Sequence, residues 1–366
     1  MQPTPLKDPF ESNMIEVPLV PWTSAPSARF PRNNNLEWLR VLFALQVVIG
    51  HCHAHLGLPL PLLLRHFPGV PAFFFVSGFL IYASHQNAGG LRYFQNRFLR
   101  LFPALLFVTL GGLVVVALSK GMNFVAGNSG TIFAWFIAQI TLGQAYNPSI
   151  FRDIGVGVIN GSLWTITTEI LFYIMVPVIV WLERYNRHSV AILTLLSFVF
   201  YAFGSLLMEG TILAGQPLWR YFWITPLVWG WMFGFGMLAF KHYRLIASRM
   251  HFLPLVLAPM LVLILVNAGG PWLNTIGQEL GIAYFVCYAM LIFYLAFGTP
   301  YLPLPFDLSY GIYIWHMPII NLLIVKGLPY PWIAMLATVA LAAFSWFAIE
   351  KPALRLKRKT IHNLSG

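Results

Sequence analysis

The sequence predicts an all-α, polytopic integral membrane protein with about ten transmembrane helices. Its 366 residues are 58% hydrophobic and only 9% charged, which is too little charge to cover a soluble domain of this size. Apolar runs of about 18 residues or more recur along the chain, and each is long enough to cross the hydrocarbon core of a bilayer. The 13 Trp, 15 Tyr and 31 Phe residues suit interfacial belts and helix packing.

The net charge of +11 does not indicate a nucleic-acid partner. The cations cluster in loops between apolar runs, as membrane topology requires, and no basic stripe runs along a soluble region. The two cysteines, Cys52 and Cys287, both lie in apolar runs. They predict neither a disulfide scaffold nor a metal knuckle, and we expect no metal.

Three regions follow from composition. Residues 1–35 are polar and rich in proline, which predicts a mostly disordered tail rather than a signal peptide. Residues 36–350 form the predicted transmembrane domain, and residues 351–366 a basic cytoplasmic tail. The first expected helix covers 36–55, the second 72–85, and the third ends at 118 after a basic segment. Seven more are expected near 163–182, 190–208, 222–240, 253–267, 280–298, 308–325 and 331–349.

The distribution of positive charge predicts the topology. Cations concentrate in the N-terminal tail and in segments 92–100, 241–249 and 351–359, and such segments favour the cytoplasm. If residues 131–146 crossed the membrane, the last two segments would lie outside. We therefore expect ten spanning helices, both termini in the cytoplasm, and 131–146 as a re-entrant or interfacial piece.

The first expected helix carries two ionisable residues on one face. Arg40 and His51 are eleven residues apart, which is about three turns and about 16 Å along a helix. Ionisable groups inside a membrane are costly and usually face a cavity or a partner. The pair could bind an anion near the surface and act as a general base deeper in. It could equally be a snorkelling arginine and a histidine bonded inside the bundle. His53 is two residues from both His51 and His55 and points to a different face of the helix, so metal ligation by the three histidines is not expected.

Two further arginines and one carboxylate extend this candidate site. Arg97 and Arg100 share a helix face at the predicted cytoplasmic end, where guanidinium groups could bind phosphates or simply anchor the helix. Glu169 is expected about 10 Å from the outer surface, at a depth similar to His51. A His51–Glu169 pair would raise the basicity of the imidazole, although a structural hydrogen bond is the alternative. His316 is expected near mid-membrane, in contact with substrate or with backbone freed by Pro318.

Six stretches in this order resemble the acyltransferase-3 family of integral membrane acyltransferases. They are Arg40 with His51, PAFFFVSGFLI (71–81), RFLRLFP (97–103), GSLWTITTEILFY (161–173), SYGIYIWHMP (309–318) and IEKPALRL (349–356). The resemblance spans about 36–356. The family that it points to includes O-antigen acetylases, exopolysaccharide acyltransferases and glucan succinyltransferases.

The resemblance implies transfer of an acyl group, commonly acetyl and in some members succinyl, from acyl-CoA to a sugar hydroxyl across the membrane. It implies that His51 is the catalytic histidine, as base or acyl carrier, and that Arg40, Arg97 and Arg100 bind the donor. Glu169 is the second catalytic candidate, on the depth estimate that pairs it with His51. The same stretches supply five candidates for the substrate pocket: Ser77, Trp164, Tyr173, Tyr310 and His316.

The expected surroundings follow from the same resemblance. They are membrane lipids, a glycan or lipid-linked sugar acceptor, partners in polysaccharide biosynthesis, and a bacterial inner membrane. No hydrolase-like domain follows the last helix in this sequence, as it does in some members, so we expect the membrane part to act alone or to pass its product to a partner. The alternative function is a proton-coupled transporter or flippase that uses the intramembrane His and Glu; a transporter has no need of acyl-CoA.

Overall fold

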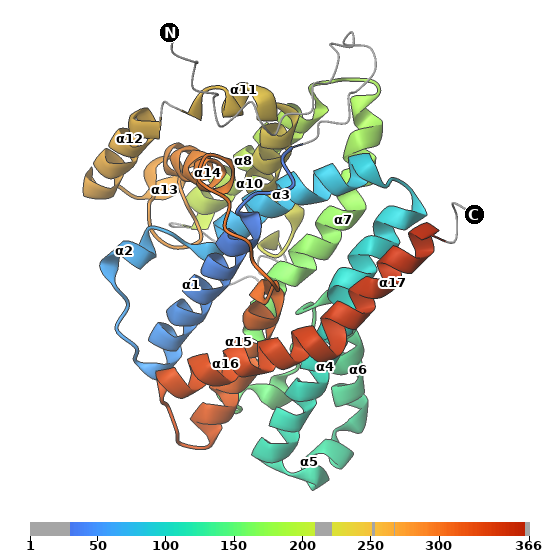
Figure 1. Ribbon diagram of the computed structural model, residues 1–366. Helices are drawn as coiled ribbons and strands as arrows, with labels where there is room; N and C mark the ends of the chain where they lie inside the picture. The colour runs from blue at the N-terminus through green and yellow to red at the C-terminus, as the bar shows by residue number, and fades with distance from the viewer. Residues whose placement is uncertain (1–29, 209–221, 251–252, 267, 363–366) are drawn as a thin grey trace, which may run out of the picture.

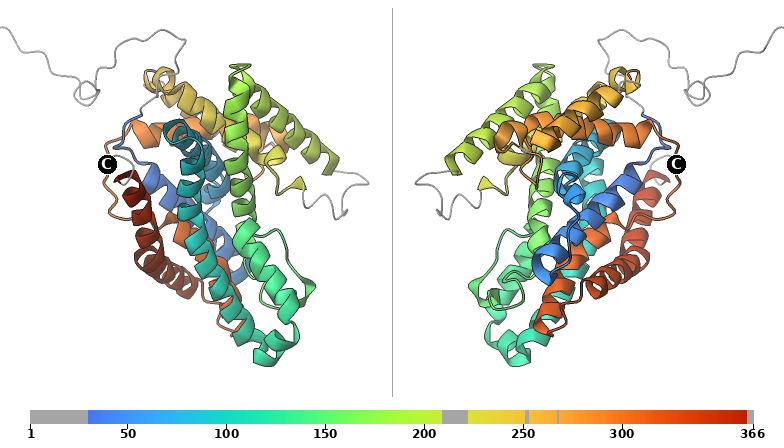
Figure 2. Two further views of the ribbon diagram at one scale, coloured as in Figure 1. Left: turned by 90° about the vertical axis from the view of Figure 1, so that its right-hand side faces the viewer. Right: turned by 90° about the vertical axis from the view of Figure 1, so that its left-hand side faces the viewer.

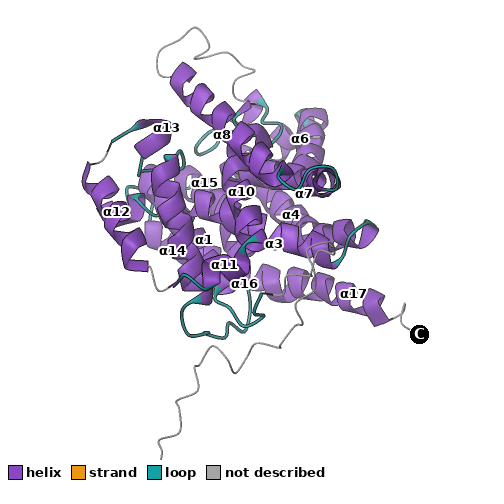
Figure 3. Ribbon diagram, turned by 90° about the horizontal axis from the view of Figure 1, so that it is seen from above, coloured by secondary structure: helices purple, strands orange, loops and turns teal. Residues whose placement is uncertain are grey.

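The computed structural model describes residues 30–208, 222–250, 253–266 and 268–362, and in this part of the chain helices joined by loops are the only regular secondary structure, without strands (Figure 3). The predicted disordered tail, residues 1–35, lies outside the described residues up to residue 29. The principal helices are α1 (Leu36–Leu56), α3 (Gly69–Asn87), α4 (Leu91–Lys120), α6 (Ser129–Leu142), α7 (Trp164–Glu183), α8 (Ser189–Met208), α10 (Pro226–Lys241), α12 (Leu253–Val266), α14 (Ile282–Phe297), α15 (Ser309–Val325), α16 (Pro331–Ser345) and α17 (Lys351–His362). Short helical turns connect them: α2 (Leu62–Arg65), α5 (Met122–Gly127), η1 (Ser149–Phe151), η2 (Gly161–Leu163), α11 (Tyr243–Ala247) and α13 (Gly270–Leu273).

The predicted fold class is confirmed, and each expected helix has a counterpart. Among the described residues four segments are long and apolar enough to cross a membrane: Leu36–Leu56, Leu91–Lys120, Gly161–Glu183 and Pro331–Leu356. Other apolar helices are shorter, such as α14 and α15. The protein is therefore an integral membrane protein, while the number of ten crossings stays a prediction.

The segment around 131–146 folds back on α4. Helix α4 runs down the molecule, and α5 with α6 forms the hairpin at its lower end (Figure 2). Helix α6 has only 14 residues, or about 21 Å, and is too short to cross a bilayer core of about 30 Å alone. Its end meets the start of α7, where the Gln144 amide donates to the Leu163 carbonyl at 3.4 Å.

The loop between α6 and α7 is held against α15 by two asparagines. The side chain of Asn321 accepts from the Val156 amide at 2.7 Å and donates to the Ile159 carbonyl at 2.9 Å. Asn160 donates to the Ile314 carbonyl at 2.8 Å. The loop thus occupies one end of the bundle, and α7 begins inside it rather than at its surface.

Helices α3 and α10 cross in close contact because glycine faces backbone at the crossing. A Cβ on Gly78 would lie 1.9 Å from the Phe233 carbonyl oxygen, and one on Gly236 would lie 2.0 Å from that of Phe75. Small residues allow such close approach between membrane helices. Gly78 belongs to the 71–81 stretch, so part of that motif serves packing.

Helix α15 lies in the interior, and nearly all of its residues are buried. Helix α16 continues through a π-helical segment, Trp346–Glu350, into α17, and the two cross the face of the bundle (Figure 1). The residues predicted as a C-terminal tail therefore continue a helix as far as His362.

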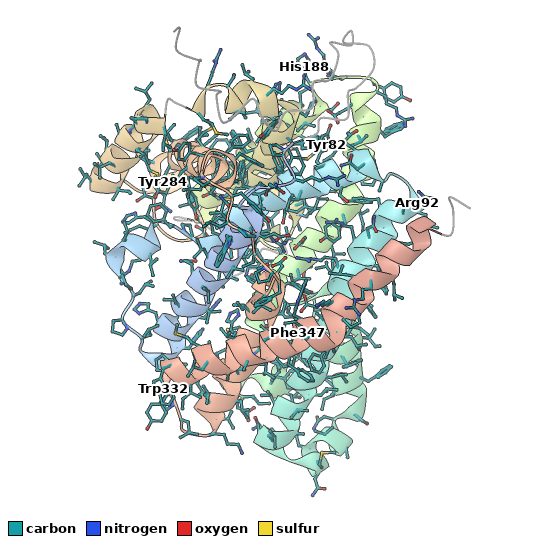
Figure 4. All side chains as sticks on the ribbon, in the orientation of Figure 1. Tyr82, Arg92, His188, Tyr284, Trp332 and Phe347 are labelled. Carbon is teal, nitrogen blue, oxygen red and sulfur yellow. The ribbon has the colours of Figure 1, made fainter. Side chains whose placement is uncertain are left out.

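Three helix ends meet near the turn between α3 and α4. The Tyr82 hydroxyl donates to Glu183 Oε2 at 2.6 Å, and Lys241 forms an ion pair with Glu183. Tyr82 and Arg92 lie in the upper half of the view in Figure 4, whereas Trp332 lies at its lower left. Two of the cation-rich segments, 92–100 and 241–249, thus start at the same end of the bundle.

Candidate active site

Helices α1 and α15 pack side by side and bring their polar residues together at two places. At one end Arg40 contacts Asp307, just before α15, and further along His51 contacts His316. The two contacts are eleven residues apart on α1, between Arg40 and His51. Only nine residues separate Asp307 from His316, because Asp307 lies in the loop before α15, where the chain rises further per residue than in a helix. The parallel packing therefore creates an arginine end and a histidine end.

Asp307 is the centre of the arginine end. Its Oδ2 atom lies 2.9 Å from Arg40 Nη1 and 2.5 Å from Arg100 Nη2. Its Oδ1 atom accepts from the backbone amide of Ser309 at 3.1 Å and from its hydroxyl at 2.5 Å. Burial alone would raise the pKa of this carboxyl, but Arg40 and Arg100 outweigh that effect and hold the pKa below its ordinary value.

The loop that carries Asp307 is fixed to the start of α1 by Asn35. The side-chain amide of Asn35 donates to Thr299 Oγ1 at 2.9 Å and to the Pro300 carbonyl at 3.0 Å. Its oxygen accepts from the Leu302 amide at 2.9 Å. These bonds hold residues 299–302 beside the first turn of α1, which places Asp307 one turn further along, at Arg40.

Arg97 has a different environment from the other two arginines. It donates to Ser84 Oγ at 3.1 Å, and its guanidinium lies over the Tyr173 ring, 5.6 Å from the centroid. Its Nε atom is buried without a hydrogen-bond partner, and no carboxylate pairs with Arg97 among the described residues. Arg97 is therefore a cation with unused hydrogen-bonding capacity.

A pocket opens beside these charges between α1, α3, α4, α7 and α15. Its empty volume is about 770 Å³, which includes the open space at its mouth. The three arginines and most of the predicted pocket residues line it: Arg40, Arg97, Arg100, Ser77, Glu169, Tyr173 and Tyr310. Trp164 is not among its lining residues and packs instead against Phe74 and Trp229.

The expected pairing of Glu169 with His51 is wrong. Glu169 Oε1 accepts from the Tyr173 hydroxyl at 2.5 Å, one turn along α7, and Glu169 lines the arginine pocket. The depth estimate assumed that α7 enters from the membrane surface. Because the loop before it fills that end of the bundle, α7 begins deeper, and Glu169 lies nearer the arginine end.

His51 instead pairs with His316. Nδ1 of His51 lies 2.9 Å from Nε2 of His316, and the ring centroids are 4.8 Å apart. His316 is fully buried and His51 is half-buried. His316 therefore contacts the candidate catalytic residue directly, a role that the sequence left open between substrate contact and backbone bonding.

The neighbouring histidines do not complete a metal site. His55 stacks on His51 with ring centroids 5.9 Å apart, while Nδ1 of His53 lies 2.6 Å from the Leu58 carbonyl oxygen. In the described part of the chain no group of three or more His, Cys, Asp or Glu residues is arranged to hold a metal ion.

Two acidic residues at the arginine end were missed by the sequence analysis. Asp307 is the only acidic residue between Glu279 and Glu350 and stands two residues before the 309–318 stretch, a signal that could have identified it. Glu350 is buried in the π-helical segment, where Ser345 Oγ donates to it at 3.0 Å. It lies close enough to Arg100 to interact electrostatically. π-helical turns are frequent at functional sites.

Comparison with known proteins identifies the family of the chain. A model of the acyltransferase domain family matches residues 33–350, so the chain belongs to the acyltransferase-3 family and is an acyltransferase. The resemblance carried by the six stretches is thereby confirmed.

Two relatives extend over nearly the whole chain. Nodulation protein 10 of Rhizobium leguminosarum bv. viciae is 28% identical over 360 residues, covering 90% of this chain and 95% of the relative. An O-acetyl transferase of Shigella phage Sf6 is 26% identical over 333 residues, covering 87% and 96%. No solved structure matches the chain.

Proposed function

We propose that this acyltransferase moves an acetyl group from acetyl-CoA to a hydroxyl of a glycan or lipid-linked sugar. One observation carries the proposal: a pocket with three arginines and a histidine pair lie at successive depths along the contact between α1 and α15. Acyl transfer from a phosphorylated thioester to an alcohol needs a site that binds the anionic donor and a group that accepts the proton of the alcohol. The relative named O-acetyl transferase is consistent with acetyl. Other members of the family transfer succinyl.

The arginine end is the proposed donor site. Arg97 has no carboxylate partner among the described residues, so it is the arginine most available to a phosphate oxygen. Arg40 and Arg100 are already compensated by Asp307. Glu37 and Glu350 also lie close enough to interact electrostatically with Arg40 and Arg100, so neighbouring carboxylates largely neutralise these two arginines.

The histidine end is the proposed site of chemistry. For Nε2 of His51 to act as a base, Nδ1 must carry the hydrogen, which it then donates to Nε2 of His316. Nε2 of His51 takes the proton of the acceptor hydroxyl, and the alcohol oxygen attacks the thioester carbonyl carbon. The C–S bond breaks, and the leaving thiolate takes the proton back from His51. The products are an ester and free CoA.

The proposed orientation places the donor in the cytoplasm and the acceptor outside. It follows the expected topology of ten crossings with both termini cytoplasmic in a bacterial inner membrane. The location of segments 92–100 and 241–249 at one end of the bundle supports it, because positive charge favours the cytoplasm. A reporter fused after Lys359 should respond as cytoplasmic; a response from the outer side would contradict this orientation.

The experiment for the donor site is equilibrium binding of acetyl-CoA to the purified protein and to Arg97→Ala. A hydrogen bond to a charged group contributes about 1.5–3 kcal/mol, so Arg97→Ala should weaken binding about 10- to 100-fold. The matched control is Arg92→Ala, which removes an exposed arginine near the start of the same helix. Wild-type binding by Arg97→Ala, or no binding by the wild type, would contradict the proposed donor site.

A further inference from the structure

The arginine pocket and the histidine pair are separated by aromatic side chains. His51 and His316 are not among the residues that line the pocket, whereas Phe73 of α3 and Tyr313 of α15 are. The ring of Tyr313 also contacts the ring of His316, with centroids 6.0 Å apart at an angle of 70°. A chemical group that moves from the pocket to the histidines must therefore pass Phe73 and Tyr313.

Phe73 completes this barrier. Its ring centroid lies 5.5 Å from that of Tyr313 and 5.8 Å from that of Phe43 on α1, and both contacts are edge-to-face. The three rings thus connect α1, α3 and α15 across the inner end of the pocket. We name this set, Phe43, Phe73 and Tyr313, the aromatic barrier.

The three rings of the barrier differ in burial and in the hydrogen bonds that fix them. The Tyr313 hydroxyl lies 2.6 Å from Thr165 Oγ1 and 3.2 Å from the Ser162 carbonyl oxygen, and only 3% of the residue is exposed. Phe43 is buried as well. Phe73 is half-buried and has no polar group to fix it. Phe73 is therefore the ring that a ligand can displace most easily.

We propose that the aromatic barrier limits the length of the acyl group, with Phe73 as the residue that sets the limit. The inference rests on the proposed function, since it concerns the acyl chain of the same donor. With the donor's phosphates at the arginines, the acyl group points toward Phe73 and Tyr313. An acetyl group adds one methyl beyond the carbonyl and needs little space. A butyryl or hexanoyl chain must displace the Phe73 ring from its contacts with Phe43 and Tyr313.

The magnitude of this discrimination follows from packing. One extra methylene on a substrate in a hydrophobic pocket changes kcat/KM by about 10- to 200-fold. We therefore expect the wild-type enzyme to prefer acetyl-CoA over butyryl-CoA by at least about tenfold in kcat/KM. Removing the Phe73 ring should open space for the longer chain and remove most of that preference.

The test compares kcat/KM for acetyl-, butyryl- and hexanoyl-CoA in the wild type and in Phe73→Ala. The variant should lower the acetyl-to-butyryl ratio about tenfold or more. Leu80→Ala is the matched control, since it enlarges the same pocket from the same helix two turns away from Phe73. Leu80→Ala should keep the wild-type ratio, whatever its effect on the rate.

The outcomes separate this inference from the function on which it rests. If the wild type transfers none of the three acyl groups, the proposed donor is wrong. If it transfers acetyl and Phe73→Ala keeps the wild-type ratio, the barrier does not select acyl length. Should Phe73→Ala fail to fold, Phe73→Leu keeps most of the apolar volume without the ring contacts, and an unchanged ratio in that variant overturns the inference equally.

Discussion

The two ends of the α1–α15 contact differ in the kind of interaction that each makes. At the arginine end, Arg40 and Arg100 share the carboxylate of Asp307 beside an open pocket. At the histidine end, two imidazoles form a hydrogen bond behind aromatic rings. Arg97, which has no carboxylate partner among the described residues, is available to an anionic ligand, whereas an imidazole pair with one ring fully buried can transfer a proton largely away from water. On the proposed function, the first end binds the donor and the second end transfers the proton.

The largest expected effect comes from the histidine end. His51→Ala should lower kcat about 10²- to 10⁴-fold, the range that a general base contributes. The measurement is the rate of acetyl transfer at saturating acetyl-CoA, with normal expression and membrane insertion as the check on folding. His53→Ala is the control, because His53 contacts the Leu58 carbonyl rather than His316. Wild-type product levels in His51→Ala would refute a chemical role for this histidine.

The same variant can separate a base from an acyl carrier. In direct transfer no acetylated enzyme forms when the acceptor is absent. Incubation of the wild type with labelled acetyl-CoA alone should therefore leave no label on the protein. Label that depends on His51 would identify this histidine as the acyl carrier, the other role that the family resemblance implies.

A large effect on stability is expected at the arginine end. Asp307→Ala leaves Arg40 and Arg100 without their shared partner, and removal of one partner from a buried ion pair costs about 3–5 kcal/mol. Thermal denaturation in detergent should detect the loss. Asp153→Ala provides the comparison, because Asp153 pairs with Lys120 while its side chain is 65% exposed, and exposed pairs contribute little. Equal melting temperatures for Asp307→Ala and the wild type would contradict the ion-pair assignment.

His316→Ala should have a smaller effect on turnover than His51→Ala. It removes the partner of Nδ1 of His51, and a hydrogen bond to a group that becomes charged contributes about 1.5–3 kcal/mol. The expected loss is about 10- to 100-fold in kcat, with little change in the KM for acetyl-CoA. Partial recovery in His316→Gln, whose side-chain oxygen can accept a hydrogen bond, would separate positioning from packing. A change confined to KM would contradict the assignment.

The smallest expected effect is the pH dependence of the Asp307 contribution. Its carboxyl has a pKa below the ordinary value because Arg40 and Arg100 outweigh the effect of burial. Its contribution to stability is therefore fully present above about pH 4, the unfolded-state pKa, and is lost as the pH falls toward the folded-state value. The difference in melting temperature between the wild type and Asp307→Asn should narrow below about pH 4. A constant difference would show that the charge of Asp307 does not matter.

The helices and the arginines could be predicted from local pattern. Long apolar runs identify buried helices whatever their neighbours, and the spacing of Arg97 and Arg100 places both on one face. Their meeting with Arg40 in one pocket was expected, because all three were placed at the predicted cytoplasmic ends of their helices. The expected depth of the residues and the pattern of charge were therefore enough to predict that the three arginines lie together.

The partners of these residues could not be predicted in the same way. The depth of Glu169 depends on a loop that fills one end of the bundle, and no periodicity reveals that. His316 meets His51 only because α1 and α15 pack in parallel. Asp307 reaches Arg40 through a loop fixed by Asn35. Each of these is a tertiary contact between segments far apart in the sequence.

The most direct test of the two-ended account is the affinity of the purified His51→Ala protein for acetyl-CoA. The account predicts the wild-type dissociation constant in a variant that no longer transfers acetyl, because the arginine end binds the donor independently of the histidines. A loss of affinity as large as that of Arg97→Ala would contradict it, since His51 would then be part of the donor site.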